Sequence, residues 1–389
     1  MPRIYLDNNA TTRPLPEIIE AMARCFRDSY ANPGSRHAEG RIARQALEDA
    51  RESIAGILGA HPREIIFTSG GTEATNLAIF GLTRSVRVPS GTDRKASAGL
   101  IALTAGEHPA TTESCRRLVD LGWRLHTLAV DSEGRLTADQ YNHLPWDDLK
   151  LVSVILAHNE TGVIQDTRPL AEQCRAHRVP LHLDAVQAVG KIPVDFRELN
   201  ASALSLGAHK FHGPRGIGAL LLRDGTPLSP YLFGGHQESG RRPGTEPVAL
   251  IVGMARALEI WAGRQNEQTA TVASLRDRLE QGLCEACAPV TVNGSREHRL
   301  PNTLNMSFPG LEGEALLIAL DLEGIDCSLG STCASGSAEP APVLVAMGCP
   351  PDVCASAVRF SVGIENTTTE IDEAIRRITA VVNRLRRSV

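Results

Sequence analysis

Residues 205–216, SLGAHKFHGPRG, are the stretch that decides the fold class. A short apolar run ends here, Lys210 follows it, and a Gly-Pro-Arg-Gly turn leads into another apolar run at 217–222. Upstream, residues 181–187 (LHLDAVQ) have the pattern of a hydrophobic strand that ends in Asp184. Because an aspartate at the carboxyl end of a parallel strand points into the ligand crevice of an open α/β sheet, the two stretches predict a ligand site around Asp184 and Lys210.

The same alternation of strand and helix patterns continues on both sides of these stretches. A short apolar run at 64–67 is followed by a glycine turn, TSGGT at 68–72, and then by a helical pattern through Phe80. This alternation predicts an α/β fold with a mostly parallel, seven-stranded sheet covered by helices on both faces. Strands are expected at 64–67, 100–103, 123–130, 151–157, 181–183, 203–206 and 217–222.

A long helical pattern from about Thr245 to Cys287 separates this region from one of mixed composition. Beyond the long helix, strands are expected at 302–308 and 358–362, and helices at 312–321 and 369–387. We therefore predict two domains. A large α/β domain covers residues 14–260, and a smaller α+β domain is formed by residues 1–13 and 261–389.

Charge and hydropathy exclude several classes of protein. The chain has 389 residues, with 40 Lys and Arg against 45 Asp and Glu, and a formal net charge of −5. Nucleic-acid binders use broadly basic surfaces, so no nucleic-acid partner is expected. The longest apolar stretch, 248–262, contains Arg256 and Glu259 and is too short to cross a membrane, which takes about 20 apolar residues. Without a signal-like N-terminus, the prediction is a cytoplasmic protein.

The cysteines do not indicate a disulfide framework or a metal site. Nine cysteines are an odd number, and without a secretory signal they favour reduced thiols. Cys284 and Cys287 form one C-x-x-C pair, but no second Cys or His pair stands at zinc-site spacing. No metal is therefore predicted.

A lysine, a strand-end aspartate and a glycine-rich turn before a helix together suit pyridoxal phosphate. Lys210 can form a Schiff base with the cofactor aldehyde, and Asp184 can keep the pyridine nitrogen protonated. The helix N-terminus after TSGGT can bind the phosphate. A lone lysine is usually a surface charge and a lone aspartate at a strand end is usually a cap, so it is their order and spacing that favour the cofactor.

Here the sequence resembles the NifS/IscS-type cysteine desulfurases, in the class V aminotransferase group of fold-type I pyridoxal-phosphate enzymes. The resemblance covers nearly the whole chain, from YLDNNATT at 5–12 to RFS at 359–361. Between them stand NPGSRH at 32–37, TSGGTEATN at 68–76, EHPA at 107–110, NETG at 159–162, GRRPGT at 240–245 and GSTCAS at 330–335. It implies an enzyme that converts L-cysteine to L-alanine and delivers sulfur to an acceptor protein such as an iron–sulfur scaffold.

The resemblance also implies cofactor contacts. Lys210 is the Schiff-base lysine, Asp184 the pyridinium partner, Gln187 the donor to the ring hydroxyl, and His108 the residue stacked on the ring and active in proton transfer. Phosphate contacts fall to Gly71, Thr72 and His209. Gly207 stands where family members usually have a phosphate-binding serine, so that contact is either lost or supplied by Ser205. Thr245 reaches the phosphate of the neighbouring subunit, which implies a homodimer.

Substrate contacts follow in the same way. Asn159 and Arg359 bind the substrate carboxylate, since a guanidinium can hold a carboxylate through two parallel hydrogen bonds, and Asn32 is a further substrate contact. Arg359 lies in an otherwise apolar strand, where a buried guanidinium is costly unless it is paired. A partner for Arg359 is therefore expected.

Cys333 is the residue that would distinguish a cysteine desulfurase from other enzymes of the class V group. It lies in SLGSTCASG at 328–336, a segment of small and hydroxyl residues that is expected to be exposed. A thiolate in such a segment can attack the sulfur of bound cysteine and carry that sulfur away as a persulfide. Cys333 and Arg359 lie 26 positions apart, a spacing that resembles the long-loop group of the family, in which the cysteine hands sulfur directly to a scaffold protein.

Other functions stay open from the sequence alone. Another class V enzyme, an aminotransferase or a selenocysteine lyase, would leave Cys333 incidental. A non-catalytic paralogue acting as a binding subunit is conceivable because Gly207 and Pro243 depart from the family pattern. The acceptor cannot be named, since iron–sulfur assembly, tRNA thiolation and DNA phosphorothioation all draw on this type of enzyme.

Overall fold

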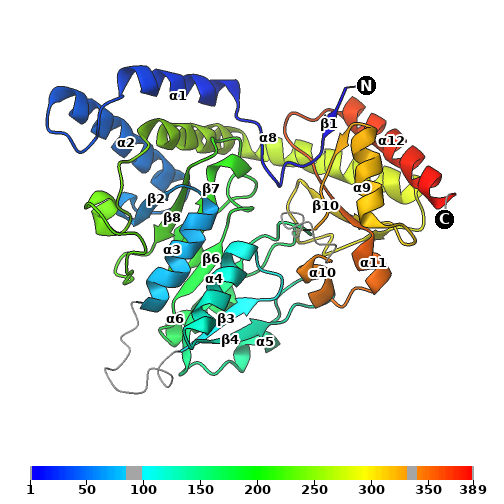
Figure 1. The fold of residues 1–389 in the computed structure, drawn as a ribbon, viewed down its shortest axis with the longest axis horizontal. Helices are drawn as coiled ribbons and strands as arrows, with labels where there is room; N and C mark the ends of the chain where they lie inside the picture. Colours follow the sequence, from blue (N-terminus) through cyan, green and yellow to red (C-terminus); the bar gives the residue numbers. More distant parts are fainter. Residues whose placement is uncertain (1, 85–98, 331–339, 388–389) are drawn as a thin grey trace.

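The computed structural model describes residues 2–84, 99–330 and 340–387. Its centre is a seven-stranded sheet in the order β2-β8-β7-β6-β5-β3-β4 (Figure 1). Only β8 runs antiparallel to its neighbours in this sheet, so the predicted mostly parallel sheet of seven strands is confirmed. The strands are β2 (Ile65–Thr68), β3 (Leu100–Thr104), β4 (Arg124–Leu128), β5 (Leu149–Ile155), β6 (Leu181–Asp184), β7 (Ala203–Gly207) and β8 (Gly218–Leu222).

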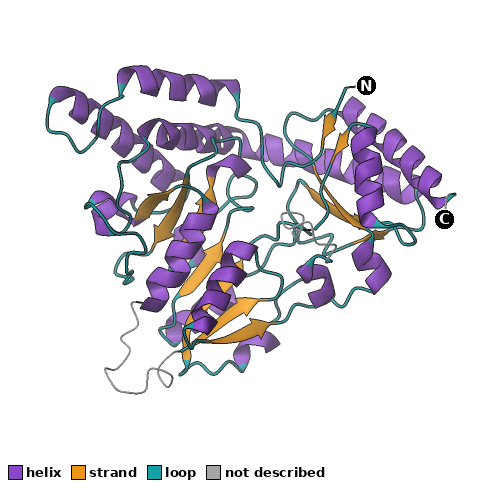
Figure 2. Ribbon diagram, viewed as in Figure 1, coloured by secondary structure: helices purple, strands orange, loops and turns teal. Residues whose placement is uncertain are grey.

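Helices cover both faces of the sheet (Figure 2). Successive side chains of a strand point to opposite faces, so Ile66 joins the core under α3 and α4, whereas Ile65 and Phe67 join the core on the other face. That second face is covered by α1, α2, α6 and the first half of α8. The helices of this part are α1 (Pro16–Asp28), α2 (Ala38–Ile57), α3 (Gly71–Arg84), α4 (Pro109–Asp120), α5 (Asp139–Asn142), α6 (Arg168–Ala176), α7 (Phe196–Leu199) and α8 (Val248–Ala286).

The C-terminal part has a hydrophobic core of its own, to which the N-terminal strand also contributes. Leu6, Leu279 and Phe360 are fully buried in this core, while Leu258, at the other end of α8, belongs to the core under the large sheet. The predicted boundary at residue 260 falls inside α8, and the two-domain division stays a prediction. The elements are β1 (Ile4–Tyr5), β9 (Thr291–Val292), β10 (Thr303–Ser307), α9 (Gly313–Leu322), β11 (Ile325–Asp326), α10 (Pro342–Ala346), α11 (Pro351–Ala355), β12 (Ala357–Ser361) and α12 (Thr368–Arg386).

The fold gathers polar strand ends at one edge of the large sheet. The parallel strands β5, β6 and β7 end at Ile155, Asp184 and Gly207, and ligand crevices of α/β sheets lie at such carboxyl ends. The N-terminal segment passes this edge, and Asn9 N donates to Ser361 Oγ of β12 at 2.9 Å. Among the described residues, no helix has both the length and the apolar character needed to cross a bilayer.

The stability of the C-terminal core is expected to depend on the buried side chains of α8. Leu279→Ala removes a fully buried side chain and leaves a cavity, which should lower the free energy of unfolding by about 2–5 kcal/mol. Ser274→Ala, on the exposed side of the same helix, should change it by no more than about 0.5 kcal/mol. Urea unfolding followed by circular dichroism measures both, and equal effects of the two variants would contradict this packing.

Candidate active site

One cavity of about 1060 Å³, including its open mouth, lies at the carboxyl ends of β5 and β6. It brings together most of the residues predicted from the sequence. Those that line it are Gly71, Thr72, His108, Asn159, Asp184, Gln187, His209, Lys210 and Arg359. Elements far apart in the chain therefore contribute to one site.

Lys210 follows β7 in a short 3₁₀ turn (Ala208–Lys210) and is partly buried. Its Nζ donates to Asn9 O at 2.6 Å and to Ala10 O at 2.9 Å. Burial, followed by the positive charge of Arg359, lowers the pKa of Lys210 to about 8. Because only the neutral amine is nucleophilic, this environment makes Lys210 more reactive near neutral pH than an exposed lysine.

Asp184 ends β6 and is 4% exposed. Its Oδ1 accepts a hydrogen bond from Val186 N at 3.0 Å. Burial raises the pKa of Asp184, while nearby His108 and the Val186 N–H oppose the shift. A buried carboxylate in a cavity wall can hold a cationic N–H donor through a charge-assisted hydrogen bond.

His108 is the N-cap residue of α4, and this cap fixes its ring. Nδ1 accepts from Ala110 N at 3.0 Å, so the neutral ring carries its proton on Nε2. Burial lowers the pKa of His108, Asp184 opposes that shift, and Lys210 adds to it. The ring is therefore neutral at pH 7, with Nε2–H available to donate and the Nδ1 lone pair used by the helix cap.

The N-terminus of α3 also lines the cavity, through Gly71 and Thr72. Gly70, in the left-handed region at φ +156°, turns the chain from β2 into the helix at Gly71. A Cβ on Gly71 would lie 2.6 Å from Val186 Cγ2, so this close approach requires glycine. The N–H groups of the first helical turn and the helix dipole together favour an anion at this place.

Arg359, in β12, is almost fully buried and has the partners that the sequence analysis expected. One terminal nitrogen donates to Asp7 Oδ1 at 2.8 Å, and the other donates to Glu160 Oε1 at 3.2 Å and to Asn159 O at 3.1 Å. Burial raises the pKa of Glu160, and Arg359 opposes this shift. Asp7 and Glu160 were not singled out from the sequence, although both stand in quoted motifs, YLDNNATT and NETG.

Asp7 also connects Arg359 to the segment that precedes Cys333. Ser328 Oγ donates to the same oxygen, Asp7 Oδ1, at 2.9 Å, and Ser328 pairs with Arg359 through two backbone hydrogen bonds. Residues 328–330 line the cavity. Cys333 itself lies outside the described residues.

Ser205 does not line the cavity, contrary to the expectation that it could supply a phosphate contact. Its side chain is fully buried, and its Oγ bonds to His182 Nε2 at 2.7 Å. His182 Nδ1 in turn contacts Ser153 Oγ at 2.9 Å, so the Ser205 hydroxyl is held in a polar chain across β5, β6 and β7. A Cβ on Gly207 would lie 3.2 Å from Gly71 N, at the start of α3, and 3.7 Å from the ring of His209.

Thr245 and Asn32 line a different cavity, of about 900 Å³, together with Tyr30. None of the residues lining this second cavity also lines the first. Thr245 was expected to act on the neighbouring subunit, so its role stays a prediction, whereas Asn32 is not brought to the substrate site of its own chain.

The chain is similar over nearly its whole length to proteins of one known family. Residues 4–374 match the family model described as Aminotransferase class-V. Cysteine desulfurase NifS of Azotobacter vinelandii is 42% identical over 387 residues, which cover 99% of this chain and 94% of that protein. A solved NifS-like protein superimposes with a TM-score of 0.90 at 35% identity, covering 98% of this chain and 100% of its own. A structure described as SspA in complex with cysteine gives a TM-score of 0.79 at 31% identity, covering 93% and 99%.

A sheet-edge lysine and aspartate beside a helix N-terminus and a buried arginine are thus arranged on the fold of a known enzyme class. The chain belongs to the class V aminotransferase family and, within it, to the NifS/IscS-type cysteine desulfurases. The resemblance inferred from the sequence motifs is confirmed.

The amine of Lys210 is expected to titrate near pH 8. An amine-reactive reagent should label Lys210 at a rate that rises with pH and is half-maximal near that value, as measured by peptide mass spectrometry on protein freed of small molecules. Arg359→Met removes a cation that disfavours the protonated amine, so the midpoint should move upward. Arg124→Met, on the surface in β4, should leave it unchanged, and a midpoint insensitive to Arg359 would contradict this electrostatic coupling.

Proposed function

We propose that this protein is a pyridoxal-phosphate-dependent cysteine desulfurase. It converts L-cysteine to L-alanine and passes the sulfur, as a persulfide on Cys333, to an acceptor protein. The observation that carries the proposal is that a partly buried amine, a buried carboxylate and a buried guanidinium (Lys210, Asp184 and Arg359) line one cavity. The names of the relatives support it, since one is a cysteine desulfurase and another was solved with cysteine.

The residues of the cavity fit pyridoxal phosphate. Lys210 would hold its aldehyde carbon, Asp184 its ring nitrogen, and the N–H groups at the start of α3, next to Gly71 and Thr72 of the cavity wall, its phosphate. Gln187, whose Nε2 donates to Asn9 O at 2.9 Å, would turn that donor to the ring oxygen. The chemistry supplied by the bound cofactor is an aldehyde that condenses with amines and a ring that withdraws electrons from the substrate carbon.

Substrate orientation falls to Arg359 and Asn159. An α-carboxylate placed against the guanidinium directs the amino group of cysteine into the cavity, toward Lys210. Asp7 and Glu160 hold the guanidinium in place, so it does not have to be ordered when substrate binds.

Proton transfer falls to Lys210 and His108. Lys210, with a pKa of about 8, can accept a proton at Nζ from the substrate α-carbon and later return it. His108, neutral at pH 7 with its Nδ1 held by the helix cap, holds a proton at Nε2 that it can donate. Asp184, which is buried in the cavity wall, would balance positive charge on the ring nitrogen of the bound cofactor.

Sulfur transfer falls to Cys333. Its thiolate attacks the substrate sulfur: an S–S bond forms, and the C–S bond breaks with its electron pair going to the substrate. Protonation of that fragment then gives alanine. Gly330, three positions before Cys333 in the sequence, lines the cavity, which supports access of this segment to the substrate.

The proposal includes a homodimer and an acceptor protein. Support for the dimer comes from Tyr30, which is 70% exposed and lines the same cavity as Thr245, a residue proposed to act on the partner subunit. The acceptor is proposed to be an iron–sulfur scaffold or a related thiolation protein. A cytoplasmic location stays a prediction from the sequence.

Cys333→Ser should abolish production of alanine and sulfide from L-cysteine while the purified protein keeps its yellow colour. The hydroxyl cannot form a persulfide, whereas the cofactor contacts are untouched. Alanine is measured by chromatography and sulfide by methylene blue formation. The matched control is Cys349→Ser, a partly exposed cysteine away from the cavity, which should keep full turnover. Undiminished turnover by the Cys333 variant would instead indicate a class V enzyme in which this thiol is incidental.

Lys210→Ala should lose the yellow colour and all turnover, because no other amine is proposed to bind the aldehyde. In the wild-type protein, borohydride treatment should attach the cofactor to the peptide that contains Lys210, as detected by mass spectrometry. Attachment at another lysine would show that the proposed anchor is wrong. A colourless wild-type protein that takes up no added pyridoxal phosphate would favour the non-catalytic paralogue.

A further inference from the structure

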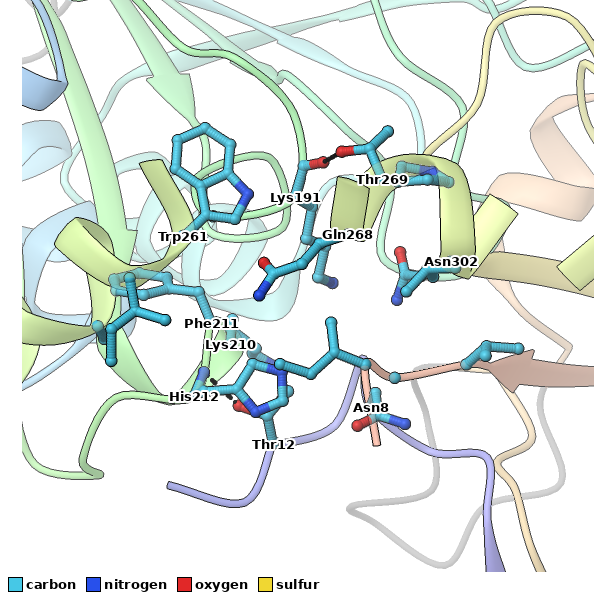
Figure 3. Close-up of a pocket in the computed structure, with 18 of the residues that line it drawn as sticks. Asn8, Thr12, Lys191, Lys210, Phe211, His212, Trp261, Gln268, Thr269 and Asn302 are labelled. Carbon is cyan, nitrogen blue, oxygen red and sulfur yellow. Dashed lines mark hydrogen bonds between the residues drawn. The ribbon is translucent and has the colours of Figure 1, made fainter. Parts of the chain in front are cut away.

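Lys191 is a buried lysine that the reaction described above does not use. It follows β6 by seven positions and is 9% exposed. Its Nζ donates to Asn9 Oδ1 at 2.7 Å and, through a short hydrogen bond, to Gln187 Oε1. Its backbone carbonyl lies against Thr269 Oγ1 of α8 at 3.5 Å (Figure 3).

Lys191 lies on the wall of a third cavity, of about 580 Å³, to which Lys210 and Asn302 also contribute (Figure 3). Gln187, in contrast, lines the active-site cavity. The amine of Lys191 therefore reaches the active site through the amide of Gln187. Burial, and then the charges of Lys210 and Arg359, lower the pKa of Lys191, so the two amide oxygens are what hold this amine in place.

The contact determines which end of the Gln187 amide faces the active site. The Gln187 atom that faces Lys191 is the oxygen Oε1, because it accepts a hydrogen bond from Lys191 Nζ. The amide nitrogen is then turned the other way, where it donates to the carbonyl of Asn9. Without Lys191, the buried Oε1 would lose the one donor that the described structure gives it, and an unsatisfied buried acceptor is costly.

We propose that Lys191 is a positioning residue for the cofactor. By donating to Gln187 Oε1, it fixes Gln187 so that Nε2 is presented to the ring oxygen of pyridoxal phosphate. This inference rests on the proposed function, because it requires that cofactor to occupy the cavity.

The test is a double-mutant cycle on cofactor binding. Lys191→Met, Gln187→Met and the double variant are prepared free of cofactor and titrated with pyridoxal phosphate. Absorbance gives the Kd and the pH midpoint of the colour change of the bound form. Lys191→Met should weaken binding about tenfold, the equivalent of one hydrogen bond, and shift the midpoint in the same direction as Gln187→Met. In the Gln187→Met background, Lys191→Met should add nothing further to either quantity.

Asn302→Ala is the matched control. Asn302 Nδ2 donates to Asn9 Oδ1 at 2.9 Å, the same oxygen that Lys191 contacts, but this hydrogen bond does not involve Gln187. It tests whether disturbance of Asn9 alone moves the midpoint. We expect its effect on the Kd to add to that of Gln187→Met and the midpoint to stay in place. If Lys191→Met does not yield folded protein, Lys191→Gln serves in the same cycle, since its shorter side chain also withdraws the amine from Gln187.

Two results would overturn the inference: a Lys191 variant with unchanged Kd and midpoint, or fully additive effects of the two substitutions. Both presuppose that the wild-type protein binds the cofactor. A wild-type protein that binds no pyridoxal phosphate refutes the proposed function as well, so the two failures are distinguishable.

Discussion

Asn9 is a buried residue whose hydrogen bonds connect the large sheet with the C-terminal part. Its side-chain nitrogen donates to Thr303 Oγ1 at 2.9 Å in β10 and to Asn159 O at 3.1 Å after β5. Its backbone carbonyl accepts from Lys210 Nζ and Gln187 Nε2. Each of these groups would be costly to bury without a partner, so the segment around Asn9 is held in one position by polar contacts on every side.

Burial explains both the reactivity and the binding capacity of the site. The environment that lowers the pKa of Lys210 raises those of Asp184 and Glu160, because removal from water always disfavours the charged form. Specific partners oppose this trend, as Arg359 does for Glu160. Lys210 therefore loses its proton more easily than an exposed lysine, and the charges of Asp184 and Glu160 depend on their hydrogen-bond partners. Groups whose pKa values are shifted in this way are suited to acid–base chemistry.

Much of the fold was predictable because its signals are local. The apolar runs that end at Asp184 and just before Lys210 are strands with the expected direction, and the TSGGT turn does begin α3. Contacts that depend on register or on distant pairing were not readable. The side chain of Ser205 is held by His182 on the neighbouring strand, which sequence spacing cannot reveal. The partner of Arg359 was expected, but Asp7 lies 352 positions away, and nothing local connects the two.

The pairing of the N-terminal segment with β12 also has a consequence for protein synthesis. Asn9 leaves the ribosome 352 residues before Ser361, whose hydroxyl accepts from it in the finished protein. The strands of the large sheet can associate while translation continues. The hydrogen bonds from Arg359 to Asp7 and from Asn9 to Ser361 can form only after β12 has been synthesised, near the end of the chain. A nascent chain is thus a partly folded scaffold that still lacks Arg359, and premature termination before β12 leaves the first segment without the strand against which it docks.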